Sequence, residues 1–252
     1  MILLLDIGNT HTHLGLANAN RVIRQANLPT ASWFDGTVER LVAPFVGQTR
    51  LSGAALCSVV PRATPQAHRF IRWRFHLDVV QLSPQTVVGI GIDYPKPDTI
   101  GPDRLANAVA VAHHFGAPAV VVDFGTAVTF DVVDRRRNYI GGIITPGLSA
   151  MTSYLHEKTA LLPNIKIRET RAVVGKSTAE AMLIGAVHGY RGLIHGLLLE
   201  LKRELKCRRL PVLATGGYAR LIAAKLPEIT AVEPLLTLEG LRLVWEARRR
   251  DG

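Results

Sequence analysis

The sequence predicts a duplicated α/β fold, with a cleft between its two copies. Each half of the chain opens with a short apolar run that ends in Asp-x-Gly, at residues 6–8 and again at residues 123–125. Each run begins the same expected order of three strands, a helix, a strand and a helix. An internal repeat of this kind indicates two copies of one α/β domain. We therefore expect a first domain at residues 1–116 and a second at residues 117–252.

The expected strands and helices follow from the spacing of apolar residues and from the turn residues between them. An apolar run that stops at an acidic residue and a glycine suits a buried strand that ends at a loop. In the first half, strands are expected at residues 1–5, 13–17, 22–28, 54–60 and 79–82, and helices at 38–46 and 65–75. In the second half, strands are expected at 119–123, 128–133, 139–144 and 211–214, and helices at 148–157, 178–205, 218–226 and 238–248. Hairpin turns are expected at 18–21 and 134–138.

The composition is typical of a globular protein that contacts no membrane. Hydrophobic residues make up 48% of the chain and charged residues 20%, a balance that excludes a disordered protein. The apolar runs are too short to span a bilayer, and residues 1–5 lack the basic flank and cleavage site of a signal peptide. The two cysteines, Cys57 and Cys207, form neither a metal-ligand spacing nor a disulfide framework. These features predict a cytoplasmic protein.

The formal net charge of +10 has two interpretations. A basic surface can bind nucleic acid, or it can attract anionic substrates. The basic residues are scattered in small groups, at 69–74, 135–137 and 248–250, without a zinc-finger, helix-turn-helix or aromatic-interleaved signature. Specific nucleic-acid binding is therefore not expected.

Two Asp-x-Gly loops are candidate phosphate-binding loops. In Asp6-Ile7-Gly8-Asn9-Thr10, the glycine lets backbone N–H groups approach an anion, and the carboxylate can hold Mg²⁺ that bridges phosphates. Alone, the pattern also fits a plain β-turn with Asx-type bonding. The second copy, Asp123-Phe124-Gly125-Thr126, stands at the equivalent point of the repeat. Two such loops facing each other would clamp a triphosphate from two sides.

Two further motifs combine a turn with a helix start. In Gly101-Pro102-Asp103-Arg104, the carboxylate of Asp103 is either a helix cap or a base that accepts the proton of a substrate hydroxyl, with Arg104 binding an anionic group. In Thr215-Gly216-Gly217, the glycine pair is either a simple strand-to-helix turn or a nucleotide contact, which we favour.

Two histidines near the first loop, His11 and His13, alternate along a strand and so share a face. They suggest a metal site, but no matching cluster of cysteine or histidine accompanies them. We favour polar contacts near the phosphate site.

The ordered set of motifs resembles the type III pantothenate kinase family of the acetate-and-sugar-kinase/Hsp70/actin superfamily. Each motif is weak alone, but the ordered set covers nearly the whole chain and is specific. Its members are Asp6–Thr10, Ser58–Pro61, Tyr94, Gly101–Arg104, Asp123–Thr129, Gly141-Gly142 with Pro146-Gly147, Thr159-Ala160 with Leu162-Pro163, Ser177-Thr178 with Glu180–Met182, Thr215–Gly217, and Leu238–Leu241.

The resemblance implies two ribonuclease H-like (actin-like ATPase) domains and ATP-dependent phosphorylation of pantothenate to 4′-phosphopantothenate, the first step of coenzyme A biosynthesis. It implies Asp103 as the catalytic base and Asp123 as the ligand of a monovalent cation. The implied ATP contacts are Asp6, Ile7, Gly8, Asn9, Thr10, His11, Thr12, His13 and Thr126. The implied pantothenate contacts are Tyr94, Gly101, Pro102, Asp103, Arg104 and Thr178.

The resemblance also implies Mg²⁺ with ATP, K⁺ or NH₄⁺ as the monovalent cation, and a homodimer. One position departs from the family, because residue 102 is proline where alanine is more common. Proline has no N–H group, so any substrate contact through that amide is in question, while the side chains of Asp103 and Arg104 are unaffected.

Two alternatives stay open at this point. The chain could be a regulatory or nucleic-acid-associated relative, against which the complete acid–glycine–threonine set speaks. It could also be another actin-fold enzyme, such as a sugar kinase or an actin-like ATPase. Such an enzyme shares the phosphate clamp but not the combination of Tyr94, Gly101–Arg104 and Ser177–Met182.

Overall fold

The structure is a computed structural model that describes residues 1–251, and the chain forms two compact units. The first unit comprises Met1–Gly116, Arg136–Ile140 and the described chain from Leu235 onward. The second unit comprises Ala117–Arg135 and Gly141–Pro234. These units differ from the domains expected from the sequence in two segments, 136–140 and 235–251, which pack with the first unit. The division into two domains at residue 116 stays a prediction.

The first unit contains a five-stranded sheet in the order β3-β2-β1-β4-β5. Its strands are β1 (Ile2–Ile7), β2 (His11–Ala17), β3 (Val22–Pro29), β4 (Gly53–Ser58) and β5 (Val79–Gln81). Strand β2 is antiparallel to β1 and β3, while β4 is parallel to β1 and β5 is parallel to β4. The buried β1 places Asp6 near its carboxyl end, where β1 turns toward β2.

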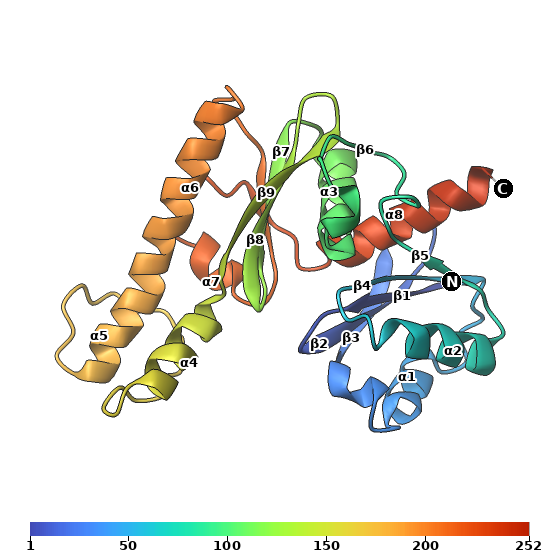
Figure 1. Ribbon diagram of the computed structural model, residues 1–252, viewed down its shortest axis with the longest axis horizontal. Helices are drawn as coiled ribbons and strands as arrows, with labels where there is room; N and C mark the ends of the chain where they lie inside the picture. Colours follow the sequence, from blue (N-terminus) through green and yellow to red (C-terminus); the bar gives the residue numbers. More distant parts are fainter. Residues whose placement is uncertain (252) are drawn as a thin grey trace. The chain divides into compact units, whose positions relative to one another are not determined.

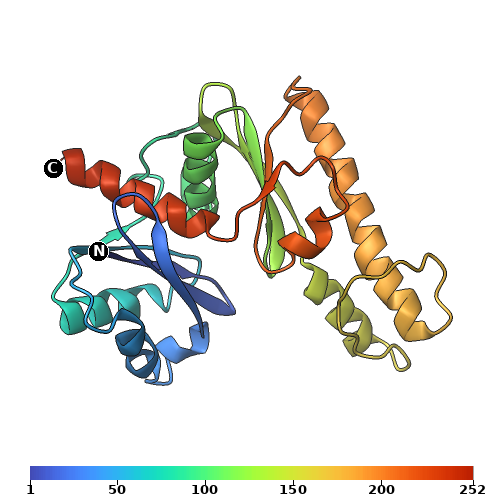
Figure 2. The ribbon, with the colours of Figure 1, turned by 180° about the vertical axis from the view of Figure 1, so that it is seen from behind.

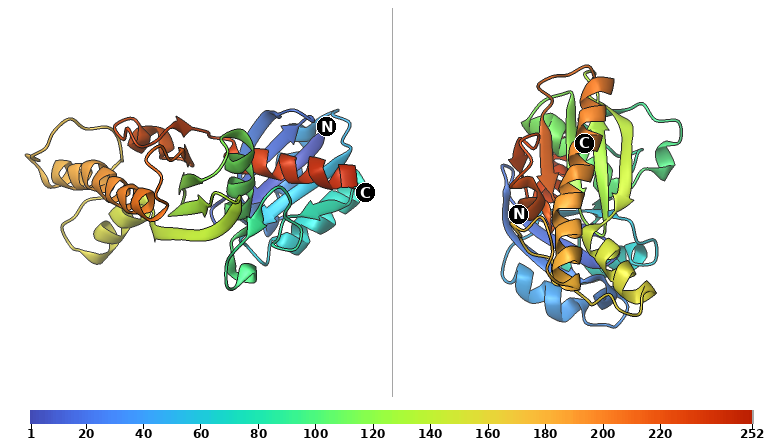
Figure 3. Two further views of the ribbon diagram at one scale, coloured as in Figure 1. Left: turned by 90° about the horizontal axis from the view of Figure 1, so that it is seen from above. Right: turned by 90° about the vertical axis from the view of Figure 1, so that its left-hand side faces the viewer.

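Two pairs of helices cover the two faces of this sheet (Figures 1 and 2). They are α1 (Val38–Val46) and α2 (Thr64–Phe75) on one face, and α3 (Pro102–His114) and α8 (Leu236–Asp251) on the other. Side chains of successive residues along a strand point to opposite faces of the sheet, so β1 contributes to the packing of the helices on both faces. Leu3 and Leu5 join a core with Phe70 of α2, while Leu4 and Leu238 lie around Gly15 on the other side. Figure 3 shows α8 lying across the strands.

The close approach of α3 and α8 depends on a glycine. A Cβ atom at Gly240 would overlap the backbone of Ala106 in α3. The buried hydroxyl of Thr237 donates a hydrogen bond of 2.9 Å to Oδ1 of Asn107. The Leu-Glu-Gly-Leu motif of the sequence is therefore a helix-packing motif in the first unit.

The second unit repeats the topology of the first. Its strands are β7 (Ala119–Phe124), β8 (Ala127–Val133), β9 (Asn138–Pro146), β10 (Val212–Thr215) and β11 (Ala231–Val232), in the order β9-β8-β7-β10-β11. Strand β8 is antiparallel to β7, while β10 is parallel to both β7 and β11, as for the equivalent strands of the first sheet. The predicted duplication is confirmed by this shared order. A short strand, β6 (Gly91–Ile92), pairs with the first two residues of β9 within the first unit.

The helices of the second unit differ from the prediction in one respect. They are α4 (Leu148–Lys158), α5 (Thr178–Ile184), α6 (Tyr190–Glu204) and α7 (Ala219–Ala223). The single helix predicted at 178–205 is interrupted by a π-helical turn at Gly185–Gly189, where two glycines weaken the α-helical preference. Short 3₁₀ turns occupy Thr30–Trp33 and Pro97–Thr99 in the first unit.

One helical run, Thr178–Glu204, is long and apolar enough to span a membrane by length and composition alone. Its mean hydropathy is 1.2, and 39% of the tested window is buried. A core helix of a soluble protein meets the same criterion, so this is weak evidence for a membrane span. The run also carries Arg191, which is buried and forms a 2.6 Å ion pair with Glu169.

Candidate active site

The first candidate phosphate loop is held in shape by a threonine outside it. The backbone N–H of Gly8 donates to the carbonyl oxygen of His11 at 3.0 Å, which closes the turn between β1 and β2. The hydroxyl of Thr30 donates to the carbonyl oxygen of Gly8 at 2.6 Å, and its N–H donates to the carbonyl oxygen of Thr10 at 3.0 Å. Asn9, Thr10 and His11 are left exposed at the tip, where their polar groups can meet an anion.

Other residues of the same segment support the loop from inside. The side chains of Ile7 and Thr12 are fully buried. The Thr12 hydroxyl accepts a 3.0 Å hydrogen bond from Nε1 of Trp33 and lies 3.1 Å from the hydroxyl of Thr30. His13, which is half-buried, is 2.7 Å from Asn27 through its Nδ1 atom. The predicted ATP contacts thus divide into an exposed tip and a buried support, and Trp33 and Thr30 are supporting residues that sequence reasoning missed.

Asp6 lies beside two other ionisable groups. The Sγ atom of Cys57, on the neighbouring strand β4, is 3.4 Å from Oδ1 of Asp6. Burial and, second, the negative charge of Asp103 raise the pKa of Asp6 to about 7, while the hydrogen bond from Cys57 acts in the opposite direction. Burial beside these carboxylates also raises the pKa of the Cys57 thiol. A carboxylate in this setting favours a nearby cation.

Asp103 stands in the first turn of α3 but is not its N-cap residue. The N-cap is Gly101, and Oδ1 of Asp103 accepts a 2.9 Å hydrogen bond from the backbone N–H of Arg104. Burial raises the pKa of Asp103, and the hydrogen bond and positive charge of Arg104 partly offset this effect. A Cβ atom at residue 101 would lie 2.5 Å from Oδ1 of Asp103, so the glycine gives the carboxylate its space.

Three further side chains lie together in the first unit. The rings of Tyr94 and Tyr139 meet edge to face, with centroids 6.1 Å apart. The guanidinium carbon of Arg104 lies 5.7 Å from the centroid of the Tyr139 ring, a cation–π distance. The structure therefore brings Tyr94, Asp103 and Arg104 into one region. Tyr139 was not predicted, because its only sequence signal was its place at the start of a strand.

In the second unit, three glycine turns converge around Asp123. A Cβ atom at Gly216 would lie 2.6 Å from Oδ1 of Asp123, and Gly216 has a φ of +87°. A Cβ atom at Gly147 would overlap the carbonyl oxygen of Thr126. The hydroxyl of Ser149 donates a 2.8 Å hydrogen bond to that of Tyr218. The motifs around residues 123–126, 146–147 and 215–217 thus form one packed cluster of backbone turns.

Thr178 lies in the first turn of α5, in the second unit. The hydroxyl of Ser177 accepts from the N–H of Glu180 at 3.2 Å, and Glu180 accepts from the N–H of Lys176 at 2.6 Å. These reciprocal contacts resemble a capping box. They explain Ser177 and Glu180 as structural residues and leave Thr178 exposed.

The metal-binding capacity of the described chain is limited. Within residues 1–251, no group of three or more His, Cys, Asp or Glu side chains could hold a metal ion. Mg²⁺ commonly binds through one or two carboxylates together with substrate phosphates. Asp6 fits that use because its half-buried carboxylate lies near the negative charge of Asp103.

The fold and these loops define a class of protein. In each of the two equivalent sheets, the first strand ends in an aspartate followed by a glycine turn. The first unit adds a half-buried carboxylate at a helix start. This combination is typical of nucleotide-dependent phosphotransferases, which work by positioning phosphates and a nucleophile.

Comparison with known proteins gives the family. The family model for type III pantothenate kinase matches residues 2–200. A type III pantothenate kinase from Methylacidiphilum infernorum is 44% identical over 246 residues, covering 97% of this chain and 88% of that protein. One from Akkermansia muciniphila is 46% identical over 241 residues, covering 96% of each. The chain belongs to the type III pantothenate kinase family.

Solved structures agree on the fold. A candidate Baf family transcriptional activator from Campylobacter jejuni has a TM-score of 0.63 at 19% identity, covering 98% of this chain and 99% of that one. The activator of 2-hydroxyisocaproyl-CoA dehydratase from Clostridium difficile, solved with bound ADPNP, has a TM-score of 0.56 at 13% identity, covering 99% and 96%. At these identities the likeness concerns the fold alone, which is the duplicated ribonuclease H-like fold of actin-like ATPases.

Proposed function

We propose that this chain transfers the γ-phosphoryl group of ATP to the primary hydroxyl of pantothenate, giving ADP and 4′-phosphopantothenate, the first step of coenzyme A biosynthesis. The observation that carries this proposal is the placement of Asp103, Asp6 and Arg104 in the first unit of a chain from this family. The reaction needs a base, an anion-binding group and a cation-binding carboxylate, and these three residues supply them.

Asp103 is the base of the proposed mechanism. Its carboxylate orients the pantothenate hydroxyl and accepts its proton as the oxygen bonds to the γ-phosphorus. The bond from that phosphorus to the bridging oxygen breaks, and ADP leaves with the electron pair. Arg104 binds an anionic group of pantothenate, and Tyr94, Gly101 and Thr178 complete its binding. Pro102 offers no N–H, so it contributes only shape.

The two Asp-x-Gly loops bind ATP in this proposal. The exposed tip, Asn9 to His11, donates to phosphate oxygens, and Thr126 contacts ATP from the second loop. Asp6 would hold Mg²⁺, which when bound neutralises phosphate charge. Asp123 would hold a monovalent cation, K⁺ or NH₄⁺. The fit is chemical, because a half-buried carboxylate beside tightly packed backbone turns suits a weakly hydrated monovalent cation.

A substrate panel tests the function. Purified chain with ATP, Mg²⁺ and K⁺ is incubated with pantothenate, glycerol, acetate and hexoses, and ADP release is measured. Phosphorylation of pantothenate alone is expected. Phosphorylation of a hexose without pantothenate would favour the sugar-kinase alternative instead.

Substitution of Asp103 tests the mechanism. Asp103→Asn keeps the size and the hydrogen bond to the N–H of Arg104 but removes the base. We expect kcat to fall roughly 10²–10⁴-fold with little change in ATP binding. Turnover within a few-fold of the unsubstituted enzyme would reduce Asp103 to an orienting role.

Activation by K⁺ tests the role of Asp123. The chain is assayed in Tris with monovalent metal ions removed and then with K⁺ added back. We expect strong activation by K⁺ and its loss in Asp123→Ala. Equal activity with and without K⁺ would show that no activating cation binds there.

We also propose a homodimer, formed through the exposed face of the helical run Thr178–Glu204, which comprises α5, the π-helical turn and α6. Gly185, Gly189, Gly192 and Gly196 are exposed there at spacings of four, three and four residues, with open space where each Cβ would stand. Nearby in the same unit, large apolar side chains are exposed, Tyr154 at 63% among them. Small residues allow helices to approach closely, and one face that meets itself across a two-fold axis forms a closed dimer.

The oligomeric state tests this surface. Gly192→Arg places a long charged side chain in this row of four glycines. The mass measured by light scattering should then change from that of a dimer to that of a monomer. Arg203→Gln, an exposed change on the same helix, serves as control. A dimer that persists in Gly192→Arg would place the interface elsewhere.

Cytoplasmic localisation and the absence of membrane and specific nucleic-acid contacts belong to the same proposal. A DNA titration at several salt concentrations checks the latter. Specific binding by a protein with net charge +10 would show tight, sequence-dependent affinity with a steep salt dependence. Only weak, sequence-independent binding is expected.

A further inference from the structure

The first unit contains a pocket at the opposite end of α3 from Asp103. It has a volume of about 350 Å³ and lies between α3, α8, the β2–β3 turn and residues 88–89. His113 lies on its wall, ten residues after Asp103, which corresponds to about 15 Å along a helix. The pocket is therefore separate from the carboxylates of the proposed reaction.

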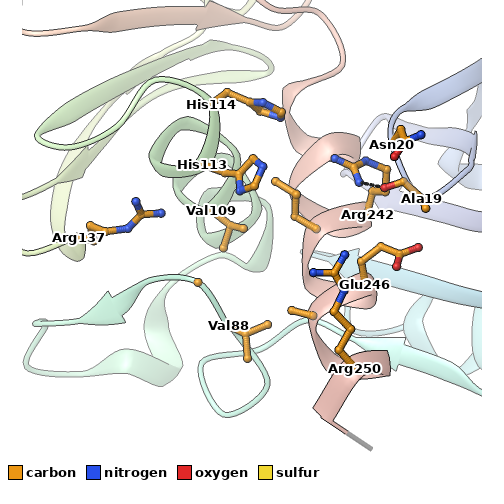
Figure 4. Close-up of a pocket in the computed structure, with 13 residues that line it drawn as sticks. Ala19, Asn20, Val88, Val109, His113, His114, Arg137, Arg242, Glu246 and Arg250 are labelled. Atoms are coloured by element: carbon orange, nitrogen blue, oxygen red, sulfur yellow. Dashed lines mark hydrogen bonds between the residues drawn. The ribbon is translucent and has the colours of Figure 1, made fainter.

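Several basic side chains point into this pocket. In Figure 4, Arg137 and Arg250 approach from opposite walls and direct their guanidinium groups toward the space around His113. Arg137 directly precedes β9, and Arg250 belongs to the last turn of α8. They thus reach the same space from distant parts of the sequence.

The negative charges around the pocket are already engaged. Nε of Arg242 is 2.7 Å from Oε2 of Glu239, and its Nη1 donates to the carbonyl oxygen of Ala19. Oε2 of Glu246 is 3.2 Å from Arg249. By contrast, the side chains of Arg137 and Arg250 form no hydrogen bond or ion pair with any residue that the structure describes. Two guanidinium charges therefore lack a neutralising partner among the side chains of residues 1–250.

Partial burial and the nearby positive charges lower the pKa of His113. Partial burial lowers the pKa of His113, and the positive charges of His114, Arg242 and Arg137 lower it further, while Glu239 opposes them. Like charges that converge without a counter-charge are unfavourable. A bound anion would remove that cost.

We propose that this pocket binds a small phosphomonoester, whose phosphate contacts Arg137, Arg250 and His113. Guanidinium groups match phosphate oxygens in charge and in fork geometry, so two of them suit a dianion. The remaining wall is mixed, and its apolar residues include Val109 and Leu243, which contact the organic part of the ligand. The volume is at the lower end of the range for small-molecule sites.

The test is calorimetric binding to the full chain, with the nucleotide site saturated by ADP and Mg²⁺. The probes are inorganic phosphate and butyl phosphate. We expect both to bind, and butyl phosphate to bind more tightly because its chain contacts the apolar wall. In Arg137→Gln/Arg250→Gln the affinity for both should fall at least about tenfold, since two charge-assisted hydrogen bonds are lost.

Two variants control for charge and folding. Arg203→Gln removes one positive charge from an exposed site in the second unit and should leave the affinities unchanged. Arg137→Lys retains the charge and should stay within a few-fold of the unsubstituted chain. The double variant should keep its thermal melting temperature and its KM for ATP, because both arginines are exposed and distant from the loops.

A spectroscopic measurement provides a second readout. Phosphate in the pocket should raise the pKa of His113, measured by NMR titration of its ring protons, and should do so less in the double variant. The proposal is overturned by an absence of binding, by equal affinity in the double variant and Arg203→Gln, or by butyl phosphate binding more weakly than phosphate. None of these measurements uses kinase activity, so the proposal is tested separately from the proposed function.

Discussion

Replacing Asp6 by asparagine is expected to stabilise the nucleotide-free chain at neutral and alkaline pH while reducing kinase activity. The Asp6 carboxyl is surrounded by buried strand residues and lies near Asp103, which together raise its pKa from 3.8 to about 7. Asparagine has nearly the same size and cannot ionise. The substitution therefore removes an unfavourable charge and at the same time the proposed Mg²⁺ ligand.

The magnitude follows from proton linkage. A carboxyl whose pKa is raised on folding favours the folded state fully below pH 3.8 and progressively less as pH rises to about 7. A shift of about three units at about 1.4 kcal/mol per unit gives a loss of about 4 kcal/mol above pH 7. For a chain of this length, that corresponds to a difference in Tm of roughly 8–16 °C.

The assay is thermal melting by circular dichroism from about pH 2.5 to pH 8.5, without ATP or divalent cations. The Tm of Asp6→Asn should equal that of the unsubstituted chain near pH 4 and exceed it increasingly toward pH 8. Asp35→Asn is a control of opposite sign, because hydrogen bonds from Thr37 lower the pKa of Asp35. That variant should be the less stable one at pH 8 and no different well below pH 3.8.

One result would refute this reasoning. If the Tm difference between Asp6→Asn and the unsubstituted chain were the same at pH 4.5 and pH 8, ionisation of Asp6 would not be its cause. Packing or a changed contact with Cys57 would then explain the difference.

Three further predictions concern glycines and the proposed base. Gly216→Ala should raise the KM for ATP strongly, because a Cβ at this position, with its φ of +87°, would lie 2.6 Å from Oδ1 of Asp123; steady-state kinetics decides, and an unchanged KM for ATP would contradict it. Gly240→Ala should lower stability by about 1–3 kcal/mol or more through overpacking of α8 on α3, measured by urea unfolding. The acid limb of kcat/KM for pantothenate should have its midpoint above 3.8, since burial raises the pKa of Asp103 and the base works when deprotonated; a pH–rate profile measures it.

The duplication could be predicted from the sequence because it rests on local signals. An apolar strand that ends in Asp-x-Gly is visible in fewer than ten residues, and it occurs twice. The packing of α8 could not be predicted in the same way. Its amphipathic pattern predicts a helix, but nothing local says that it packs on α3 of the first unit through Gly240 and Ala106.

The candidate site could be predicted residue by residue but not as an arrangement. Motif residues such as Asp103 are recognisable by their neighbours in sequence. The contact of Cys57 with Asp6 depends on β4 lying next to β1, and the stacking of Arg104 near Tyr139 depends on the start of β9 packing with the first unit. Such contacts are tertiary, so the two cysteines looked alike in the sequence although one of them touches a candidate site residue. The assigned roles of the site residues remain predictions.

The repeated topology explains why the two aspartates are suited to different tasks. Each ends a central strand and pairs in register with a residue of the parallel neighbour strand, Asp6 with Cys57 and Asp123 with Thr215. After Thr215 the chain enters a glycine turn whose backbone packs directly on Asp123. Near Asp6 the pKa is raised first by burial and then by the negative charge of Asp103, while the hydrogen bond from the Cys57 thiol lowers it. On the same topology, the second carboxylate near Asp6 thus favours a strongly charged cation there, while backbone turns pack tightly around Asp123. This difference in neighbours, more than the motif itself, supports assigning Mg²⁺ to the first loop and a monovalent cation to the second.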